Sequence, residues 1–144
     1  MEETIGFFTA DVDFQLADEV EIGLWIQALV HQSGREIDSL AYIFCTDPYL
    51  LELNKTHLDH DYYTDILTFP YSDPDAKRIQ SEIYISIDRV KENAESMKVD
   101  FIEELHRVMV HGVLHLLGHD DHGDQAQKFM RSLEDDALKR RNWL

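Results

Sequence analysis

The segment VHGVLHLLGHDDHGD, residues 110–124, carries residues whose types and spacing could support chemistry. His111 and His115 are four residues apart in an apolar run that predicts a helix, and side chains at i and i+4 lie on the same helical face. Both imidazoles can therefore reach one point in space. Two imidazoles plus one further nitrogen or oxygen ligand make up an open catalytic zinc site, in which the remaining position is left for water. The pattern predicts a metal-dependent hydrolase.

The third ligand is expected just beyond the helix. Gly118 tolerates the positive φ that often ends a helix, so the residues after it can fold back toward the histidines. The spacing matches that of metzincin-type zinc sites, whose third ligand lies six residues after the second histidine. That position is Asp121, and the adjacent His122 is chemically the more usual donor. Both types are accepted zinc ligands; the spacing favours Asp121 and leaves His122 as the alternative.

The residue after the first histidine is unfavourable for a peptidase. Zinc peptidases of the His-Glu-x-x-His type carry their general base at this position, and this chain has Gly112 there. A bound metal ion can still lower the pKa of its water to about 7 and polarise a phosphoryl oxygen. Glu103, Glu104 and Asp120 could substitute as the base, although acids on a helix surface are usually only solvated.

Length and composition indicate one globular domain spanning residues 1–144. This length is enough for one core, and no apolar run approaches the ~18 residues that cross a bilayer. The start of the chain, MEETIGFF, lacks the basic region and cleavage site of a secretory signal. The single cysteine, Cys45, cannot form an internal disulfide, which fits a reducing compartment. We expect a cytoplasmic protein that does not associate with membranes.

The chain is strongly acidic, with a formal net charge of −16. This charge repels polyanions at long range, so broad non-specific binding to nucleic acid is disfavoured and DNA is not an expected partner. A locally positive site remains compatible with the charge, above all where a metal ion supplies it.

Hydrophobic periodicity predicts the elements that position the histidines. The segment 101–117 predicts a long helix that carries the histidine pair in its last two turns. Other helices are expected after an N-cap at Asp18, after Asp47 as N-cap with Pro48 at the first helical position, and over 89–98 and 124–140. Strands are expected over 40–46, 66–71 and 83–88, with one or two weaker ones within 3–16, and a surface loop over 57–63. Together they predict an α+β fold with a small mixed sheet of about four strands, packed with helices that include a zincin-like metal helix.

Several motifs resemble those of the YbeY family, bacterial metal-dependent endoribonucleases linked to ribosomal RNA maturation. The resemblance rests on three segments in the order the family shows and on a closing helix: LNKTHLDHDYYTDILTFPY (53–71), SEIYISID (81–88), HGVLHLLGHDDH (111–122) and FMRSLEDDALK (129–139). These segments cover most of the chain from Leu53 onward.

The resemblance implies that His111, His115 and Asp121 hold one Zn²⁺ or another divalent transition-metal ion per chain. These residues would be the catalytic ones, acting through the water on the metal. The family's usual third histidine falls at Asp121 in this chain. The site would therefore consist of two histidines and an aspartate, unless His122 substitutes.

The resemblance also implies residues that contact the substrate or support the site. Thr64 and Asp65 would lie near the cleft, where Asp65 could orient a ligand histidine or the loop. The family tends to carry an arginine, a residue suited to phosphate, at the position of Leu58. Lys55, His57 and His60 are the cationic candidates nearby.

The implied function is that of a single-strand-specific, zinc-dependent endoribonuclease. It would act in maturation of the 3′ end of small-subunit ribosomal RNA and in ribosome quality control, by attack of metal-bound hydroxide on a phosphodiester. Its partners would be single-stranded RNA, ribosomal RNA and the small ribosomal subunit with its proteins. Two alternatives are a zinc metallopeptidase, disfavoured by Gly112, and a non-catalytic ribosome-assembly factor with a structural metal. Structural zinc normally has four protein ligands, and only three are evident here.

Overall fold

The computed structural model describes residues 2–144 of the chain. In this range the elements are, in chain order, β1 (Thr4–Thr9), α1 (Glu19–Gln32), β2 (Glu36–Cys45), α2 (Asp47–Leu58), β3 (Ile66–Pro70), β4 (Arg78–Ser86), α3 (Ile87–Met97), α4 (Phe101–Leu116) and α5 (Asp124–Lys139). Within residues 2–144, none of the helices combines the length and the apolar character that crossing a bilayer requires.

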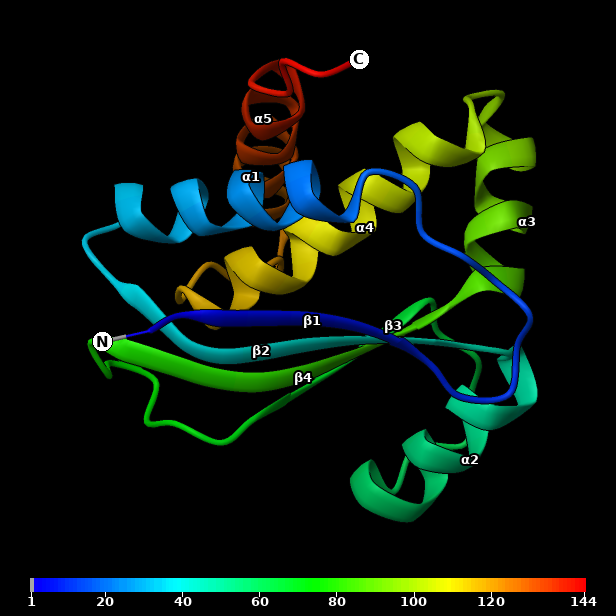
Figure 1. Ribbon diagram of the computed structural model, residues 1–144. Helices are drawn as coiled ribbons and strands as arrows, with labels where there is room; N and C mark the ends of the chain where they lie inside the picture. The colour runs from blue at the N-terminus through cyan, green and yellow to red at the C-terminus, as the bar shows by residue number, and fades with distance from the viewer. Residues whose placement is uncertain (1) are drawn as a thin grey trace.

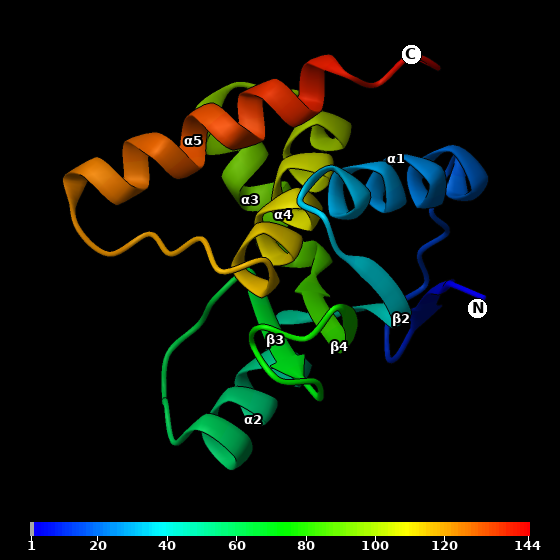
Figure 2. The ribbon, with the colours of Figure 1, turned by 90° about the vertical axis from the view of Figure 1, so that its left-hand side faces the viewer.

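The strands form one mixed sheet in the order β1-β2-β4-β3. β1, β2 and β4 are parallel, whereas β3 runs antiparallel to β4 at the edge of the sheet. Figures 1 and 2 show α1, α3, α4 and α5 on one side of the sheet and α2 on the other. The expected α+β fold with a small mixed sheet is confirmed, and of the strands expected within residues 3–16, β1 forms.

The packing centres on α4. This helix contacts the sheet through β3 and β4, and it also contacts α1, α3 and α5 (Figure 2). A helix enclosed on several sides needs apolar residues around most of its circumference. The buried apolar residues of α4 are Leu105, Val108, Met109, Val110, Val113 and Leu114.

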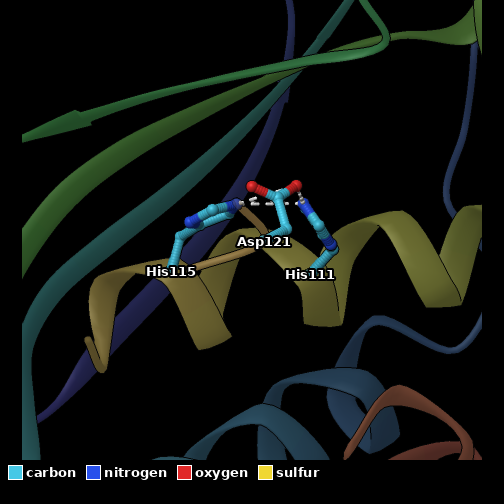
Figure 3. A group of neighbouring side chains, drawn as sticks. All are labelled: His111, His115 and Asp121. Atoms are coloured by element: carbon cyan, nitrogen blue, oxygen red, sulfur yellow. Dashed lines mark hydrogen bonds and ion pairs between the residues drawn. The ribbon is translucent and has the colours of Figure 1, made fainter. Parts of the chain in front are cut away.

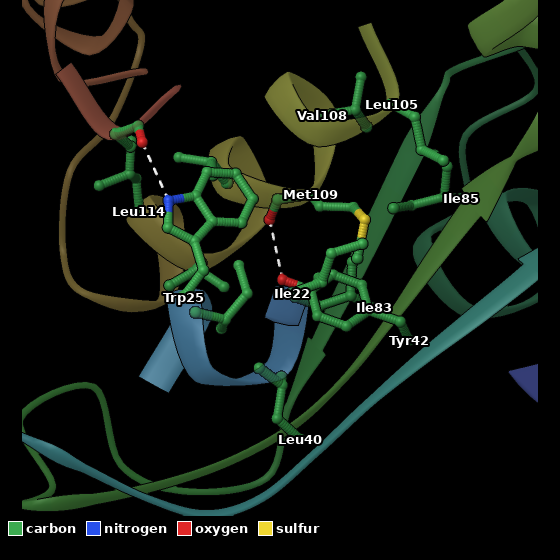
Figure 4. Packing of buried hydrophobic residues seen from close by; sticks show 14 of the residues in the cluster. Ile22, Trp25, Leu40, Tyr42, Ile83, Ile85, Leu105, Val108, Met109 and Leu114 are labelled. Atoms are coloured by element: carbon green, nitrogen blue, oxygen red, sulfur yellow. Dashed lines mark hydrogen bonds between the residues drawn. The ribbon is translucent and has the colours of Figure 1, made fainter. Parts of the chain in front are cut away.

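The core around α4 contains two large aromatic residues whose polar atoms are paired (Figure 4). The hydroxyl of Tyr42 on β2 donates a 2.9 Å hydrogen bond to the carbonyl oxygen of Met109. The indole N–H of Trp25 on α1 donates a 2.9 Å hydrogen bond to the carbonyl oxygen of Ala137 on α5. Because a buried donor without a partner destabilises a fold, these bonds favour one position for each helix.

Gly112 allows α4 to approach the sheet closely. A Cβ atom added to this residue would lie 2.8 Å from Cδ1 of Ile66 and 3.2 Å from Cδ1 of Ile83. Optimal carbon–carbon contacts are about 3.5–4.0 Å. A larger residue would therefore force the side chains of Ile66 and Ile83, or α4 itself, to shift at the turn that carries His111.

The start and the end of α2 differ from expectation. The N-cap is Thr46 rather than Asp47, because the Thr46 hydroxyl accepts a backbone N–H of the first turn. The helix continues to Leu58 and ends where Asp59 takes a left-handed conformation with φ 55°. The loop expected over 57–63 is correspondingly shorter at its beginning.

Two strands also differ in extent. β2 starts at Glu36 and β4 at Arg78, earlier than expected, because their polar first residues pair through the backbone of the parallel ladder. β4 ends at Ser86, whose hydroxyl accepts a backbone N–H and caps α3. Ile87 and Asp88 are therefore helical, although the alternating pattern continues through them.

Replacement of Gly112 by alanine should destabilise the protein by about 1 kcal/mol, because overpacking typically costs about 1–3 kcal/mol and exceeds the gain in helix propensity. Gly23→Ala in α1 is the matched control, since a Cβ atom there meets nothing within 4 Å. We expect this control to stabilise the protein by about 0.5–1 kcal/mol. Urea denaturation measures both; equal stabilisation by both substitutions would contradict the close approach at Gly112.

Candidate metal centre

His111 and His115 project from one face of α4 in its last two turns (Figure 3). After the helix ends, Gly118 adopts a φ of 99° and the chain turns back. The backbone N–H of His119 donates a 3.0 Å hydrogen bond to the carbonyl oxygen of Leu114, which closes this turn. The turn directs the following loop toward the two histidines.

Asp121 reaches the histidines from this loop (Figure 3). The Nε2 atoms of His111 and His115 are 3.1 Å apart. Oδ2 of Asp121 lies 3.6 Å from Nε2 of His111 and 3.8 Å from Nε2 of His115. Ligands bound tetrahedrally at about 2.0–2.1 Å from Zn²⁺ would be about 3.3 Å from one another. The three donors therefore fit a metal ion in both type and spacing.

His122, the alternative third ligand, does not join this group. Among residues 2–144, the group of three or more side chains that could hold a metal ion consists of His111, His115 and Asp121. His122 is exposed, and its backbone N–H donates to Oδ1 of Asp120 at 3.2 Å. The geometry favours Asp121, and its role as a ligand stays a prediction.

Glu134 on α5 is hydrogen-bonded to His111 at Nδ1, the ring nitrogen that faces away from the metal group. Its Oε2 lies 2.6 Å from Nδ1 of His111, so neutral His111 donates its Nδ1–H to this carboxylate and keeps Nε2 free for a metal ion. Glu134 is buried, and Met130 and Ala137 beside it on α5 are buried too. The signal for Glu134 in the sequence is an acid among the apolar positions of an amphipathic helix, and its partner on another helix cannot be read from that pattern.

Arg107 fixes Glu134 in turn. One guanidinium nitrogen lies 2.9 Å from Oε1 of Glu134 and another lies 2.6 Å from Oδ1 of Asp135. Arg107 precedes His111 by one turn of α4, so the same helix carries both the metal-directed histidine and the cation that anchors its partner. The network joins α4 to α5 across the site.

The two histidines differ in their affinity for protons. The hydrogen bond to Glu134 raises the pKa of His111 above its ordinary value. Burial, followed by the charge of His111, lowers the pKa of His115. Since a metal ion must displace any proton from the coordinating nitrogen, metal binding competes with protonation chiefly at His111.

A cavity beside the group is lined by acidic residues. Asp65 and Glu104 line it together with His111, and burial raises the pKa of both carboxyl groups. Asp65, expected to support the site, accepts a 3.3 Å hydrogen bond from Asn93 rather than one from a ligand histidine. Glu104, expected to be a solvated acid, is buried.

The other residues expected near the substrate do not line this cavity, and their contact with the substrate stays a prediction. Thr64 donates from its hydroxyl to the carbonyl oxygen of Ile66 at 3.4 Å and does not line this cavity. Lys55 and His57 lie near the end of α2, on the opposite side of the sheet from α4 (Figure 1). Lys55 pairs with Asp61 at 3.7 Å, and His57 packs against a phenylalanine of β3.

The position of Gly112 also weakens the peptidase alternative. A Cβ atom at this position would lie 2.8 Å from Cδ1 of Ile66, so a glutamate there would have to displace the isoleucine side chains that pack on the helix. Of the three substitutes considered for the missing base, Glu103 pairs with an arginine and Asp120 is exposed, whereas Glu104 faces the cavity.

Substitution of Asp121 by alanine should weaken Zn²⁺ binding by at least about 100-fold, because loss of a direct ligand exceeds the 10- to 100-fold cost of losing an outer hydrogen-bond partner. His122→Ala is the matched control and should change the affinity by less than about twofold. Calorimetric titration of the apoprotein measures both. The reverse order of effects would identify His122 as the ligand.

Replacement of Glu134 by glutamine should lower Zn²⁺ affinity by about 10- to 100-fold, since the partner of His111 loses its charge. Asp135→Asn is the control, because Asp135 pairs with the same arginine without contacting His111. Competition with a chromogenic chelator gives the affinities, and thermal unfolding reports on the fold. Equal affinities in the two variants would exclude Glu134 as the residue that orients His111.

Comparisons with known proteins agree with this architecture. The family model described as "Endoribonuclease YbeY" matches residues 10–142. Two proteins named Endoribonuclease YbeY are similar: one from Cytophaga hutchinsonii is 46% identical over 99% of each chain, and one from Flavobacterium psychrophilum is 45% identical over 92% of this chain and 93% of that protein. The solution structure of a Thermotoga maritima protein superposes with a TM-score of 0.65 at 25% identity, covering 94% of this chain and 87% of that one. The chain belongs to the Endoribonuclease YbeY family.

Proposed function

We propose that this chain is a single-strand-specific, zinc-dependent endoribonuclease that matures ribosomal RNA, with residues 1–144 forming one catalytic domain. Membership of the Endoribonuclease YbeY family makes it a hydrolase of the endoribonuclease class and makes RNA its substrate. The convergence of His111, His115 and Asp121 within one group is the observation that supports metal dependence.

The protein side chains would hold and orient the metal ion. His111 and His115 offer Nε2, and Asp121 offers a carboxylate oxygen. Glu134 keeps the proton of His111 on Nδ1 and so directs the lone pair of Nε2 toward the site. A divalent ion held there supplies Lewis-acid chemistry, because it lowers the pKa of water and polarises a phosphoryl oxygen.

Access to the group favours catalysis over a structural metal. The side chains of His111, His115 and Asp121 are 23%, 33% and 39% exposed, and all three face solvent-accessible space. Structural zinc sites are closed by four protein ligands, whereas only three protein donors converge here in residues 2–144. The remaining coordination position is thus available to water or substrate.

The acidic charge bears on the partners of the chain. At −16, the protein gains little from long-range attraction to RNA. We therefore propose that it docks on a basic protein of the small ribosomal subunit. This places its action in the cytoplasm. There it would mature the 3′ end of small-subunit ribosomal RNA and serve ribosome quality control.

Incubation of end-labelled single-stranded RNA with Zn²⁺-loaded protein should yield internal cleavage products. His115→Ala should lower the cleavage rate by at least about 100-fold, because it removes one of the three metal donors. His119→Ala is the control, since this neighbouring histidine packs on Phe129 and lies outside the metal group.

Three outcomes separate the explanations. Cleavage that requires His115 and is abolished by a chelator supports the proposal. Equal cleavage by wild type and His115→Ala would reveal a contaminating ribonuclease. Intact RNA after incubation with the fully loaded wild type, with or without small subunits, would contradict the proposed activity.

A further inference from the structure

The metal group borders two cavities. His111 and Asp121 line the first cavity, and His115 lines the second. α4 contributes to the wall of both, and so does the edge strand β3, through Ile66 in the first cavity and Thr68 in the second. Residues of α3 and α5 complete the first cavity. The two cavities therefore lie on either side of the metal group along α4 and beside β3, and together they are called the groove.

This groove is long enough for several nucleotides. The first cavity reaches Glu104 on α4 and the second reaches Leu116. At 1.5 Å per residue, this stretch of helix spans about 18 Å. Stacked nucleotides rise by about 3.4 Å along one strand, so the groove accommodates about five of them. The metal group lies between its two ends.

Arg131 supplies a cation at the first end. It lies on α5, lines the first cavity and is exposed. No side chain within residues 2–144 forms an ion pair or hydrogen bond with its guanidinium group by the usual distance criteria. The other arginine of this cavity, Arg107, is held by Glu134 and Asp135. Arg131 is thus the cation of the cavity whose charge is available to a ligand.

Arg35 supplies a cation at the second end. It is half-buried and lines the cavity next to His115. Its guanidinium donates hydrogen bonds to two carbonyl oxygens, 2.8 Å from that of Ala76 and 3.4 Å from that of Leu116. In the described chain, residues 2–144, no carboxylate pairs with it. Of the five N–H donors of an arginine, several remain for an anion.

The acids of the first cavity determine where an anionic chain can lie. Asp65, Glu104 and Glu134 line this cavity, and Glu104 and Glu134 are buried, so like charge keeps phosphate out of its interior. Arg131 of the same cavity is exposed, and a phosphate can reach it from solvent without entering among these acids. Phosphates are therefore attracted to the metal group, to Arg131 and to Arg35. Arginine suits this task because its planar guanidinium binds two phosphate oxygens at once.

We propose that single-stranded RNA lies along the groove between α4 and β3, with its scissile phosphodiester at the metal group. Arg131 binds a backbone phosphate on one side of that bond and Arg35 binds one on the other side. This proposal rests on the proposed function and adds the path of the substrate. A strand held on both sides of the metal is cut internally, as an endonuclease requires.

Salt dependence of cleavage tests the two arginines. For each phosphate contact to a single strand, the slope of log(kcat/KM) against log[salt] should change by about 0.7. Arg131→Gln and Arg35→Gln should each make the slope shallower by this amount and lower kcat/KM by about 10- to 100-fold at low salt. Metal content measured in parallel should stay unchanged.

Two variants control for the loss of one positive charge nearby. The first is Lys128→Gln, because Lys128 lies on the same helix as Arg131. The second is Lys77→Gln, because Lys77 lies close to Arg35, where it donates to the carbonyl oxygen of Gly34. Neither lysine lines the groove, so both glutamine variants should keep the wild-type slope. If the wild type cleaves RNA and the arginine variants keep its slope, the proposed path is wrong and the proposed function stands. If the wild type cleaves no RNA, both are wrong.

A substrate-based test avoids any effect of Arg35→Gln on folding. Single methylphosphonates, which are uncharged, are placed in turn along an RNA that contains one cleavage site. Wild type should be slowed by neutralisation at one position on each side of the cleaved bond. Arg131→Gln should be insensitive at one of these positions. Sensitivity confined to one side of the cleaved bond would overturn the proposal.

Discussion

The contact of Gly112 with the sheet is the constraint on which the site depends. Because no side chain separates the helix from Ile66 and Ile83, α4 lies close against β3 and β4. The residues on either side of this contact along the helix can then face the edge strand directly. His111 is one of them, so the same close approach that fills the core also places a metal donor at the groove. Core packing and chemistry use adjacent faces of one helix turn.

The polar network around His111 explains how an apolar helix carries a charged site. Glu134 and Arg107 are largely removed from solvent, and each is paired with the other and with a further partner. A buried charge without such partners would cost several kcal/mol. The network therefore satisfies the groups that orient the site and joins α4 to α5. Because the surface is strongly acidic, the cations of the groove that no carboxylate within residues 2–144 pairs with, Arg131 and Arg35, are the points that attract an anionic strand.

The sequence was sufficient for the features that depend on local spacing. The helical period of the segment 101–117 predicted where His111 and His115 lie, and the metzincin-like spacing favoured Asp121 over His122. The bounds of α2 and the first residues of β2 and β4 were missed, because they depend on a cap and on pairing with a distant strand. Glu134 was missed for the same reason: its partner is on another helix, and only docking of the two helices brings them together.

The residues that complete the metal site come from successive parts of the chain. His111 and His115 lie on α4, but Asp121 lies in the following loop and Glu134 lies on α5. α5 is synthesised after α4, and a domain generally folds as a unit, so the site is complete only once α5 has left the ribosome and docked. Until α5 docks, His111 lacks the carboxylate that orients it. High metal affinity, and with it any cleavage, would therefore mark a finished chain and not a nascent one.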